Sequence, residues 1–329
     1  MEPTKDTFDA RAAALDELLG TGRSFDMVTR PLTIAGRRAR LWVVNGYAED
    51  ALLERAISAW RPIGSLADTP DLQAFLERYV SVCDAAVERD RLTAVTAVFA
   101  GKTLLIIDGY EGGLLMDAKQ FPLRSVEEPN SSKVLRGSHD GFVESIMKNA
   151  ALLRRRIRDP ALTLERLQVG GRSRADVALC YMRGQADETL IAELSEKLAH
   201  MDVGSVAMSQ ESIAEAIAPK QWYNPFPKVR YTERPDTATA CVMEGDVLLL
   251  IDTPAVMIFP VSILRFAEEI NDYYFPPLVG SYLRIVRLVV LFLTIFVTPL
   301  WYLLVKSPDT LHENLHFLLI EGECPVPLI

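Results

Sequence analysis

The longest uninterrupted apolar run of the chain lies near its C-terminal end. Residues Leu288–Val305 form an 18-residue run without a charged side chain. A helix rises about 1.5 Å per residue, so this run spans roughly 27 Å, close to the thickness of the hydrocarbon core of a bilayer. Trp301 and Tyr302 stand near the end of the run, where amphipathic rings favour a membrane interface. The pattern predicts one transmembrane helix.

The charges that flank this run predict its orientation. Arg284 and Arg287 precede it, and Lys306 follows it together with acidic residues. The side richer in Lys and Arg faces the cytoplasm in most membrane proteins. We therefore expect the part before the run to be a cytoplasmic head. The first twenty residues, MEPTKDTFDARAAALDELLG, are acidic and amphipathic and lack the apolar centre of a secretory signal.

The hydrophobic pattern of the head occurs twice. One copy starts at Leu32 and the other at Leu167. In each copy a strand-like apolar run ends at a glycine, Gly46 or Gly184, and the pattern of an amphipathic helix follows. An internal repeat of this length indicates two similar structural units.

The second halves of the two copies correspond more closely. The segment 97–116 aligns with the segment 240–259. Two residues recur at a spacing of 144, as Gly101 with Gly245 and Asp108 with Asp252. Each segment predicts a hairpin in which a first strand turns at the glycine into a continuous apolar strand, LLII or LLLI.

These elements predict an α/β (α+β) fold with two similar mixed-sheet subdomains, helices packed on the sheets, and a transmembrane helix after them. A helix over Gly141–Arg158 is expected in the connector between the subdomains. The predicted divisions are an N-terminal amphipathic segment 1–24, subdomain 25–120, connector 121–160, subdomain 161–277, transmembrane region 278–306 and a C-terminal tail 307–329.

Composition adds few functional constraints. The chain is 49% hydrophobic and 24% charged with a net charge of −9, which is typical of a folded protein and gives no electrostatic reason to bind nucleic acid. The four cysteines are far apart and show no zinc spacing, so we predict neither a metal site nor a cofactor. Cys180 and Cys241 lie in apolar, strand-like sequence and are expected to be buried thiols.

Two features could carry chemistry. Asp108 and Asp252 each end an apolar strand, where a carboxylate suits a general base, a metal ligand or a cap for nearby backbone amides. Their presence in both copies favours a role in the fold. Since no nucleophile, base and metal ligands come together in the sequence, we predict no catalytic residues and no enzyme activity.

Two further segments have alternative interpretations. Arg154, Arg155 and Arg156 close a predicted helix, where cations oppose the negative end of the helix dipole on a solvated face. Alternatively they contact anionic lipid headgroups or an acidic neighbouring subunit. The aromatic and proline-rich segment 222–236 is either a packed loop or a contact surface.

Several strings resemble one known family. GSHDGFVESIMKNAALLRRRIRDP (Gly137–Pro160), SRADVALCYMRGQAD (Ser173–Asp187) and NPFPKVRYTERPD (Asn224–Asp236) resemble the A-subunit family of spore germination proteins. Residues 24–50 are most similar to its stage V sporulation protein AF branch. The resemblance covers residues 24–305. It marks these residues as family-motif or interface candidates: Asp140, Gly141, Phe142, Arg154, Arg155, Arg156, Asn224, Pro225, Phe226, Pro227, Tyr231, Glu233, Arg234, Pro235 and Asp236.

The resemblance implies a role in sporulation and germination, not catalysis. It implies a cytoplasmic two-subdomain head on a helical bundle in the inner spore membrane. The AF branch implies a homo-oligomeric, ion-conducting complex with a small membrane partner protein, which amplifies ion release. Receptor A subunits instead imply assembly with other germination proteins, a transporter-like nutrient-binding subunit and a lipoprotein.

The sequence departs from the family pattern in two places. Ser138-His139 stand where many members carry Pro-Arg, and the chain reaches Ile329 just after its first apolar span. We therefore expect either a fragment or a truncated paralogue, and one helix lines a conduit only when several copies assemble. The leading hypothesis is an AF-like membrane component whose head scaffolds an ion-release oligomer. The alternatives are the A subunit of a nutrient germinant receptor and a membrane-tethered module that binds a small ligand between its two halves.

Overall fold

The computed structural model describes residues 7–119, 140–170, 174–201, 209–217, 229–260 and 276–306. The chain divides into two compact units. One comprises residues 1–133 and 138–261, and the other comprises residues 134–137 and 262–329. The first unit contains two successive α/β repeats, and the described part of the second is one long helix.

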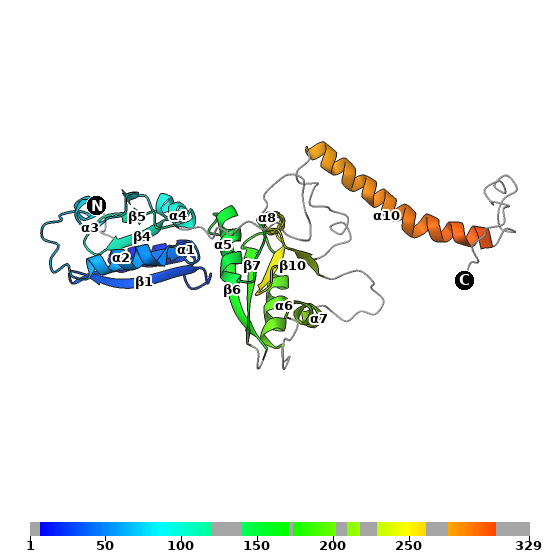
Figure 1. Ribbon diagram of the computed structural model, residues 1–329, viewed down its shortest axis with the longest axis horizontal. Coiled ribbons are helices and arrows are strands. Elements are labelled where there is room, and N and C mark those ends of the chain that lie inside the picture. Colours follow the sequence, from blue (N-terminus) through cyan, green and yellow to red (C-terminus); the bar gives the residue numbers. More distant parts are fainter. Residues whose placement is uncertain are drawn as a thin grey trace, which may run out of the picture. The chain divides into compact units, whose positions relative to one another are not determined.

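The first repeat is a five-stranded sheet with four helices (Figure 1, blue to cyan). Its strands lie in the order β1-β2-β4-β5-β3, and each pair is antiparallel. Its elements are α1 (Phe8–Leu19), β1 (Met27–Ile34), β2 (Arg37–Val44), α2 (Asp50–Trp60), α3 (Leu72–Tyr79), β3 (Ala85–Glu88), α4 (Arg91–Phe99), β4 (Thr103–Ile107) and β5 (Gly113–Met116).

The second repeat follows the same succession (Figure 1, green to yellow). Its strands lie in the order β6-β7-β9-β10-β8, again with antiparallel pairs. Its elements are α5 (Ile146–Arg156), β6 (Leu162–Val169), β7 (Ala175–Met182), α6 (Glu188–Ala199), α7 (Ser209–Ile217), β8 (Arg230–Thr232), α8 (Pro235–Met243), β9 (Val247–Ile251) and β10 (Val256–Phe259). Two similar α+β subdomains are thereby confirmed.

The sheets differ from the prediction in one respect, because they are antiparallel and not mixed. The helices between β2 and β4 return the chain to the end of the sheet at which β2 stops, since Trp42 pairs with Leu104. Strand β4 therefore runs opposite to β2. The succession of strands, helix and hairpin indicates a mixed sheet, but a helix between two strands does not require a parallel crossover.

The predicted hairpins are displaced by one element. The apolar residues before Gly101 and before Gly245 belong to helices α4 and α8, not to strands. Both glycines have a positive φ, which ends the helix. A short apolar run does not distinguish a buried helix from a buried strand. The real hairpins lie further along, where β4 turns into β5 and β9 turns into β10.

Helices cover both faces of each sheet. In the first repeat, α1 and α4 pack over Trp42 and Leu104, while α2 and α3 pack over Leu41 and Leu105. Successive strand residues point to opposite faces, so every residue of β4 is buried. In the second repeat α5 and α8 cover one face and α6 and α7 cover the other. This explains why β4 and β9 are continuous apolar runs.

Helix α5 is shorter than predicted. It runs from Ile146 to Arg156, whereas the sequence indicated Gly141–Arg158. It leads into β6 as α1 leads into β1, so by element order it corresponds to the first helix of the other repeat.

The second unit contains helix α10 (Pro277–Lys306). Within its stretch Leu278–Leu303 an 18-residue window has a mean hydropathy of 2.1, and none of that window is buried. It is the one described helix long and apolar enough to cross a membrane. The helix starts before the apolar run, so Arg284 and Arg287 lie within it. The Thr294 hydroxyl donates to the Val290 carbonyl at 2.8 Å, which satisfies this polar group within the helix.

Candidate functional site at the junction of the repeats

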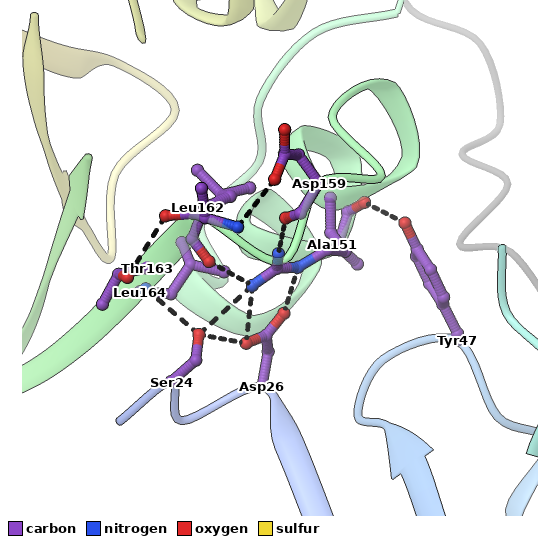
Figure 2. Close-up of polar contacts among 10 residues, drawn as sticks. Ser24, Asp26, Tyr47, Ala151, Asp159, Leu162, Thr163 and Leu164 are labelled. Carbon is purple, nitrogen blue, oxygen red and sulfur yellow. Dashed lines mark hydrogen bonds and ion pairs between the residues drawn. The ribbon is translucent and has the colours of Figure 1, made fainter. Parts of the chain in front are cut away.

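A buried ion pair joins the two repeats. Arg154 lies on α5, and Asp26 directly precedes β1. Their side chains are 1% and 0% exposed, and Arg154 Nε donates to Asp26 Oδ2 at 2.8 Å. Arg154 Nη2 also donates to Asp26 Oδ1 and to Ser24 Oγ, each at 3.2 Å. Figure 2 shows Ser24 and Asp26 next to each other within this network.

The same guanidinium also binds the second repeat. It donates to the carbonyl oxygens of Asp159 at 3.1 Å and Leu162 at 3.0 Å, at the start of β6. Its carbon atom Cζ lies 5.1 Å from the centre of the Phe99 ring on α4. Arg154 thus contacts Asp26 and Phe99 of one repeat and the chain around Leu162 of the other. The planar guanidinium suits such multiple hydrogen bonding.

The backbone before β1 pairs with the second sheet. The Phe25 N–H donates to the Leu164 carbonyl at 3.0 Å, and the Leu164 N–H donates to Ser24 Oγ at 3.1 Å. The Ser24 hydroxyl in turn donates to Asp26 Oδ1 at 2.6 Å. Residues 24–25 therefore lie along strand β6, and the polar atoms that this contact buries are hydrogen-bonded to one another.

Tyr47 makes a further contact between the repeats. Its hydroxyl donates to the Ala151 carbonyl on α5 at 3.2 Å (Figure 2). Burial raises the pKa of the Tyr47 phenol well above its usual range, so the group remains a donor. Next to it, Gly46 has a φ of +85°, and a Cβ there would lie 3.2 Å from the Ala151 Cβ. The close approach of the β2–α2 turn to α5 requires glycine.

Motif residues around Phe142 gather at the start of α5. Asp140 accepts two hydrogen bonds from Arg156 Nη2, both at 2.7 Å. Gly141 is buried, and the Phe142 N–H donates to the Glu233 carbonyl at 2.9 Å. The Phe142 side chain is 2% exposed and belongs to the core under α5.

The TERPD string forms the start of α8. Arg234 is fully buried and forms an ion pair with Asp236 at 2.6 Å. Pro235 occupies the first turn, where its missing N–H costs nothing. Asp236 also accepts from the Thr237 N–H, and its negative charge favours the N-terminal end of a helix. Tyr231 on β8 is 43% exposed.

The structure therefore brings together two motif strings that are far apart in the sequence, 140–142 and 232–236, with Arg156 next to the first. The interpretation of the arginine run as a solvated helix end is wrong for Arg154, which is buried; Arg155 is exposed. Asn224, Pro225, Phe226 and Pro227 lie outside the described residues. Asp26 and Ser24 were missed, because no local periodicity marks a partner 128 residues away.

The repeated aspartates are linked to the first helix of each repeat, Asp252 directly and Asp108 through Arg38. Asp252 Oδ1 accepts from the Ile146 N–H, at the first turn of α5, at 3.2 Å. Asp108 accepts from Arg38 at 3.2 Å, and Arg38 also pairs with Asp9 on α1 at 3.0 Å. In both repeats this carboxylate is thus used in the fold. In the part of the chain that the structure describes, no group of three metal-ligating side chains occurs.

The protein family of the chain follows from its match to a family model. The model described as Bacillus/Clostridium GerA spore germination protein matches residues 13–329. The chain belongs to the GerA family. The resemblance seen in its strings is confirmed, and its GerA-type head contains the junction described above.

Individual GerA relatives extend this match. Stage V sporulation protein AF of Bacillus subtilis (strain 168) is 36% identical over 315 residues, which cover 94% of this chain and 63% of that protein. Spore germination protein B1 of the same organism is 30% identical over 301 residues, which cover 89% of this chain and 61% of that protein. The chain thus spans about three-fifths of the length of these curated relatives.

A solved structure shares the fold. It is the N-terminal domain of the A subunit of the Bacillus megaterium spore germinant receptor GerK3, with a TM-score of 0.60 and 24% sequence identity. The match covers 79% of this chain and 96% of that chain. At this identity the likeness concerns the α+β architecture of the two repeats.

Proposed function

We propose that this GerA-family chain is a non-catalytic, AF-like membrane component of germination whose head scaffolds a homo-oligomeric ion-release complex. The observation that carries the proposal is its 36% identity to Stage V sporulation protein AF over 94% of the chain. In this proposal the complex amplifies ion release together with a small membrane partner protein and other germination proteins.

The junction supports a scaffold role. Arg154, Asp26 and Ser24 are buried and bonded to one another, so none of them is free to act on a substrate. Such a network holds the two repeats together. A rigid head of this kind suits a scaffold on which other subunits assemble. Arg156 and Asp140 add a second, partly exposed pair at the same helix.

Helix α10 supports the membrane location. Its apolar side chains are exposed and do not pack in a protein core, so they favour a lipid environment. Arg284 and Arg287 near its start favour a cytoplasmic head under the positive-inside rule. The location proposed for the helix is the inner spore membrane.

A gene deletion tests the proposal. Spores without the gene are triggered with several nutrients in turn, and potassium in the medium is followed with an ion-selective electrode. We expect slower release with every nutrient, and restoration when the wild-type gene is returned. Unchanged release kinetics with all nutrients would contradict the proposed role.

The second candidate is the A subunit of a nutrient germinant receptor. The 30% identity to spore germination protein B1 over 89% of the chain favours it. The same deletion distinguishes the two candidates. Loss of the response to one nutrient, with normal release for the others, indicates a receptor subunit, whereas a uniform slowing indicates an amplifier.

A further inference from the structure

One side of helix α5 makes much of the contact between the two repeats. Met147, Ala151 and Arg154 lie along this side, because residues three and four apart are neighbours on a helix. Ala151 belongs to the apolar core of the first repeat, and Arg154 lies over the Phe99 ring. A Cβ on Gly46 would lie 3.2 Å from the Ala151 Cβ and 3.5 Å from the Met147 side chain. The leading helix of the second repeat thus packs on a turn and a helix end of the first.

The matching side of α1 is uncovered. The two leading helices align by four apolar residues at the same spacing, Phe8, Ala12, Leu15 and Leu19 in α1 and Ile146, Ala150, Leu153 and Ile157 at α5. This alignment matches Met147 with Asp9 and Ala151 with Ala13. Ala13 is exposed, and the Asp9 side chain is 74% exposed. The side of the helix that is buried in the second repeat therefore faces solvent in the first.

The surface that α5 covers on the first repeat is open on the second. Gly184 stands at the turn that corresponds to Gly46, and the 144-residue spacing matches Phe99 with Met243. A Cβ on Gly184 would meet nothing within 4 Å. Phe99 is 1% exposed, whereas Met243 is 58% exposed. A flexible and polarizable methionine suits a binding surface.

The two uncovered surfaces complement each other. Ala13 on one and Gly184 on the other are the same pair of residue types that approach closely at the junction. Asp9 takes the place of Met147, and the exposed Arg183 directly precedes Gly184. Since Met147 lies against the glycine turn at the junction, an equivalent contact places the Asp9 carboxylate beside the Arg183 guanidinium. Small residues and opposite charges thus meet in one arrangement.

We propose that these two surfaces bind each other in neighbouring copies of the chain. Helix α1 of one copy packs on the Gly184 turn and the Met243 end of α8 of the next, as α5 packs on the first repeat. This inference rests on the proposed function, in which copies of the chain assemble, and it names the surfaces that join their heads. Because the surfaces are unlike, the contact is head-to-tail, and successive contacts close a ring or extend a filament.

The contact between copies does not repeat the buried ion pair of the junction. The counterpart of Arg154 in the helix alignment is Asp16, which accepts hydrogen bonds from Arg40 and Trp42 of its own repeat. The contact between copies therefore depends on its own Asp9–Arg183 pair.

Cross-linking between two populations of the full chain, reconstituted together into liposomes, tests the proposal. Both carry Cys83→Ser and Cys324→Ser, so that the remaining native thiols are buried. One population carries Ala13→Cys and the other carries Gln185→Cys, next to the glycine turn. With a short, membrane-permeant bis-maleimide we expect covalent dimers in the mixture and none in either population alone, because unlike surfaces meet.

An exchange of charges tests the ion pair in the same assay. Asp9→Arg in the Ala13→Cys population is expected to lower the yield of dimers about fivefold, because it replaces an attraction by a repulsion. Arg183→Asp in the other population then restores the yield. Glu54→Arg makes the same change of charge at an exposed position of α2 and leaves the yield unchanged.

The outcomes separate this surface from the proposed function. Dimers in either population alone, or no restoration by the exchanged charges, would overturn the proposal. Absence of dimers in the mixture, while native mass spectrometry shows an oligomer, would overturn this surface and leave the scaffold role intact. A chain that is monomeric throughout would contradict both.

Discussion

At the scale of the residue, the central feature is one arginine whose role depends on its burial. Arg154 and Arg155 are neighbours on α5 and have the same charge, but only Arg154 is enclosed with Asp26. Removing two charges from water is costly, and only close pairing with further hydrogen bonds offsets it. Here Ser24, Asp159 and Leu162 provide those bonds.

Replacing this arginine tests the buried pair. Arg154→Met leaves the Asp26 carboxylate buried without its cation, and we expect a loss of about 3–5 kcal/mol in the free energy of unfolding. Arg155→Met changes an exposed side chain and is expected to cost less than about 0.5 kcal/mol. Urea unfolding of the full chain in detergent, followed by tryptophan fluorescence, measures both.

The double variant Asp26→Asn with Arg154→Met gives a further check. It removes both charges, so we expect it to be more stable than Arg154→Met alone. Equal losses for Arg154→Met and Arg155→Met would contradict the role assigned to the pair.

Tyr47 predicts a dependence on alkaline pH. Burial raises the pKa of its phenol above the usual value in the unfolded chain, so the folded state holds the proton more tightly. The resulting stability is complete below about pH 10 and is lost as the pH rises through the folded-state pKa. We expect the loss to reach about 1 kcal/mol for each pH unit above 10.

Tyr47→Phe removes this contribution. At pH 8 it costs about 1 kcal/mol through the lost hydrogen bond to Ala151. Between pH 10 and pH 11 the variant is expected to lose less stability than the wild type in urea unfolding. Parallel losses in the two proteins would show that Tyr47 is not the responsible group.

At the scale of the element, the duplication allows equivalent helices and turns of the two repeats to be compared. Helices α1 and α5 occupy the same place in the succession, and α5 also contacts the other repeat, through Arg154 and Ala151. Gly46 and Gly184 stand at the same turn of the two repeats and both have a positive φ. Only Gly46 lies against α5; a Cβ at Gly184 would meet nothing within 4 Å.

This difference predicts unequal effects of one substitution. Gly184→Ala carries the backbone cost alone, about 1–2 kcal/mol for a left-handed conformation. Gly46→Ala carries the same cost and also presses on Ala151, so we expect about 1 kcal/mol more. Thermal unfolding of the two variants measures the difference, and equal costs would show that the turn does not press on α5.

At the scale of the whole molecule, the apolar helix determines where the chain resides. Helix α10 exposes Leu293, Ile295 and Val297 along its length, whereas every residue of the apolar strands β4 and β9 is buried. A single long helix satisfies its own backbone hydrogen bonds, which is the requirement for lying in lipid.

We predict that the chain sediments with membranes and resists extraction by alkaline carbonate. Changing Leu293, Ile295 and Val297 together to Asp adds about 3 kcal/mol per position to the cost of insertion, so most of the chain becomes extractable. Leu92→Asp, at a 66% exposed position of α4, serves as the control and leaves the chain in the membrane fraction. Quantitative immunoblotting of both fractions measures the effect, and retention of the triple variant would contradict a membrane-spanning role for α10.

The elements that were predicted correctly are those with a local signal. The apolar run within α10, the two amphipathic helices α2 and α6, and the strand-like runs of β2 and β7 follow from the hydrophobic pattern. The strands predicted before Gly101 and Gly245 were wrong, since these segments form helices α4 and α8. A short buried helix and a short buried strand can have the same apolar composition. Antiparallel pairing was also missed, since strand direction depends on where a connection re-enters the sheet.

The sequence by itself therefore determined the duplication, the membrane segment and the family, because each is recorded in composition, spacing or recurring strings. Only the tertiary structure shows which groups the charged side chains of the protein bind. Asp26 meets Arg154 across 128 residues, and Asp252 meets the start of α5 across 106. Such contacts depend on how two folded repeats pack, and no local pattern encodes them.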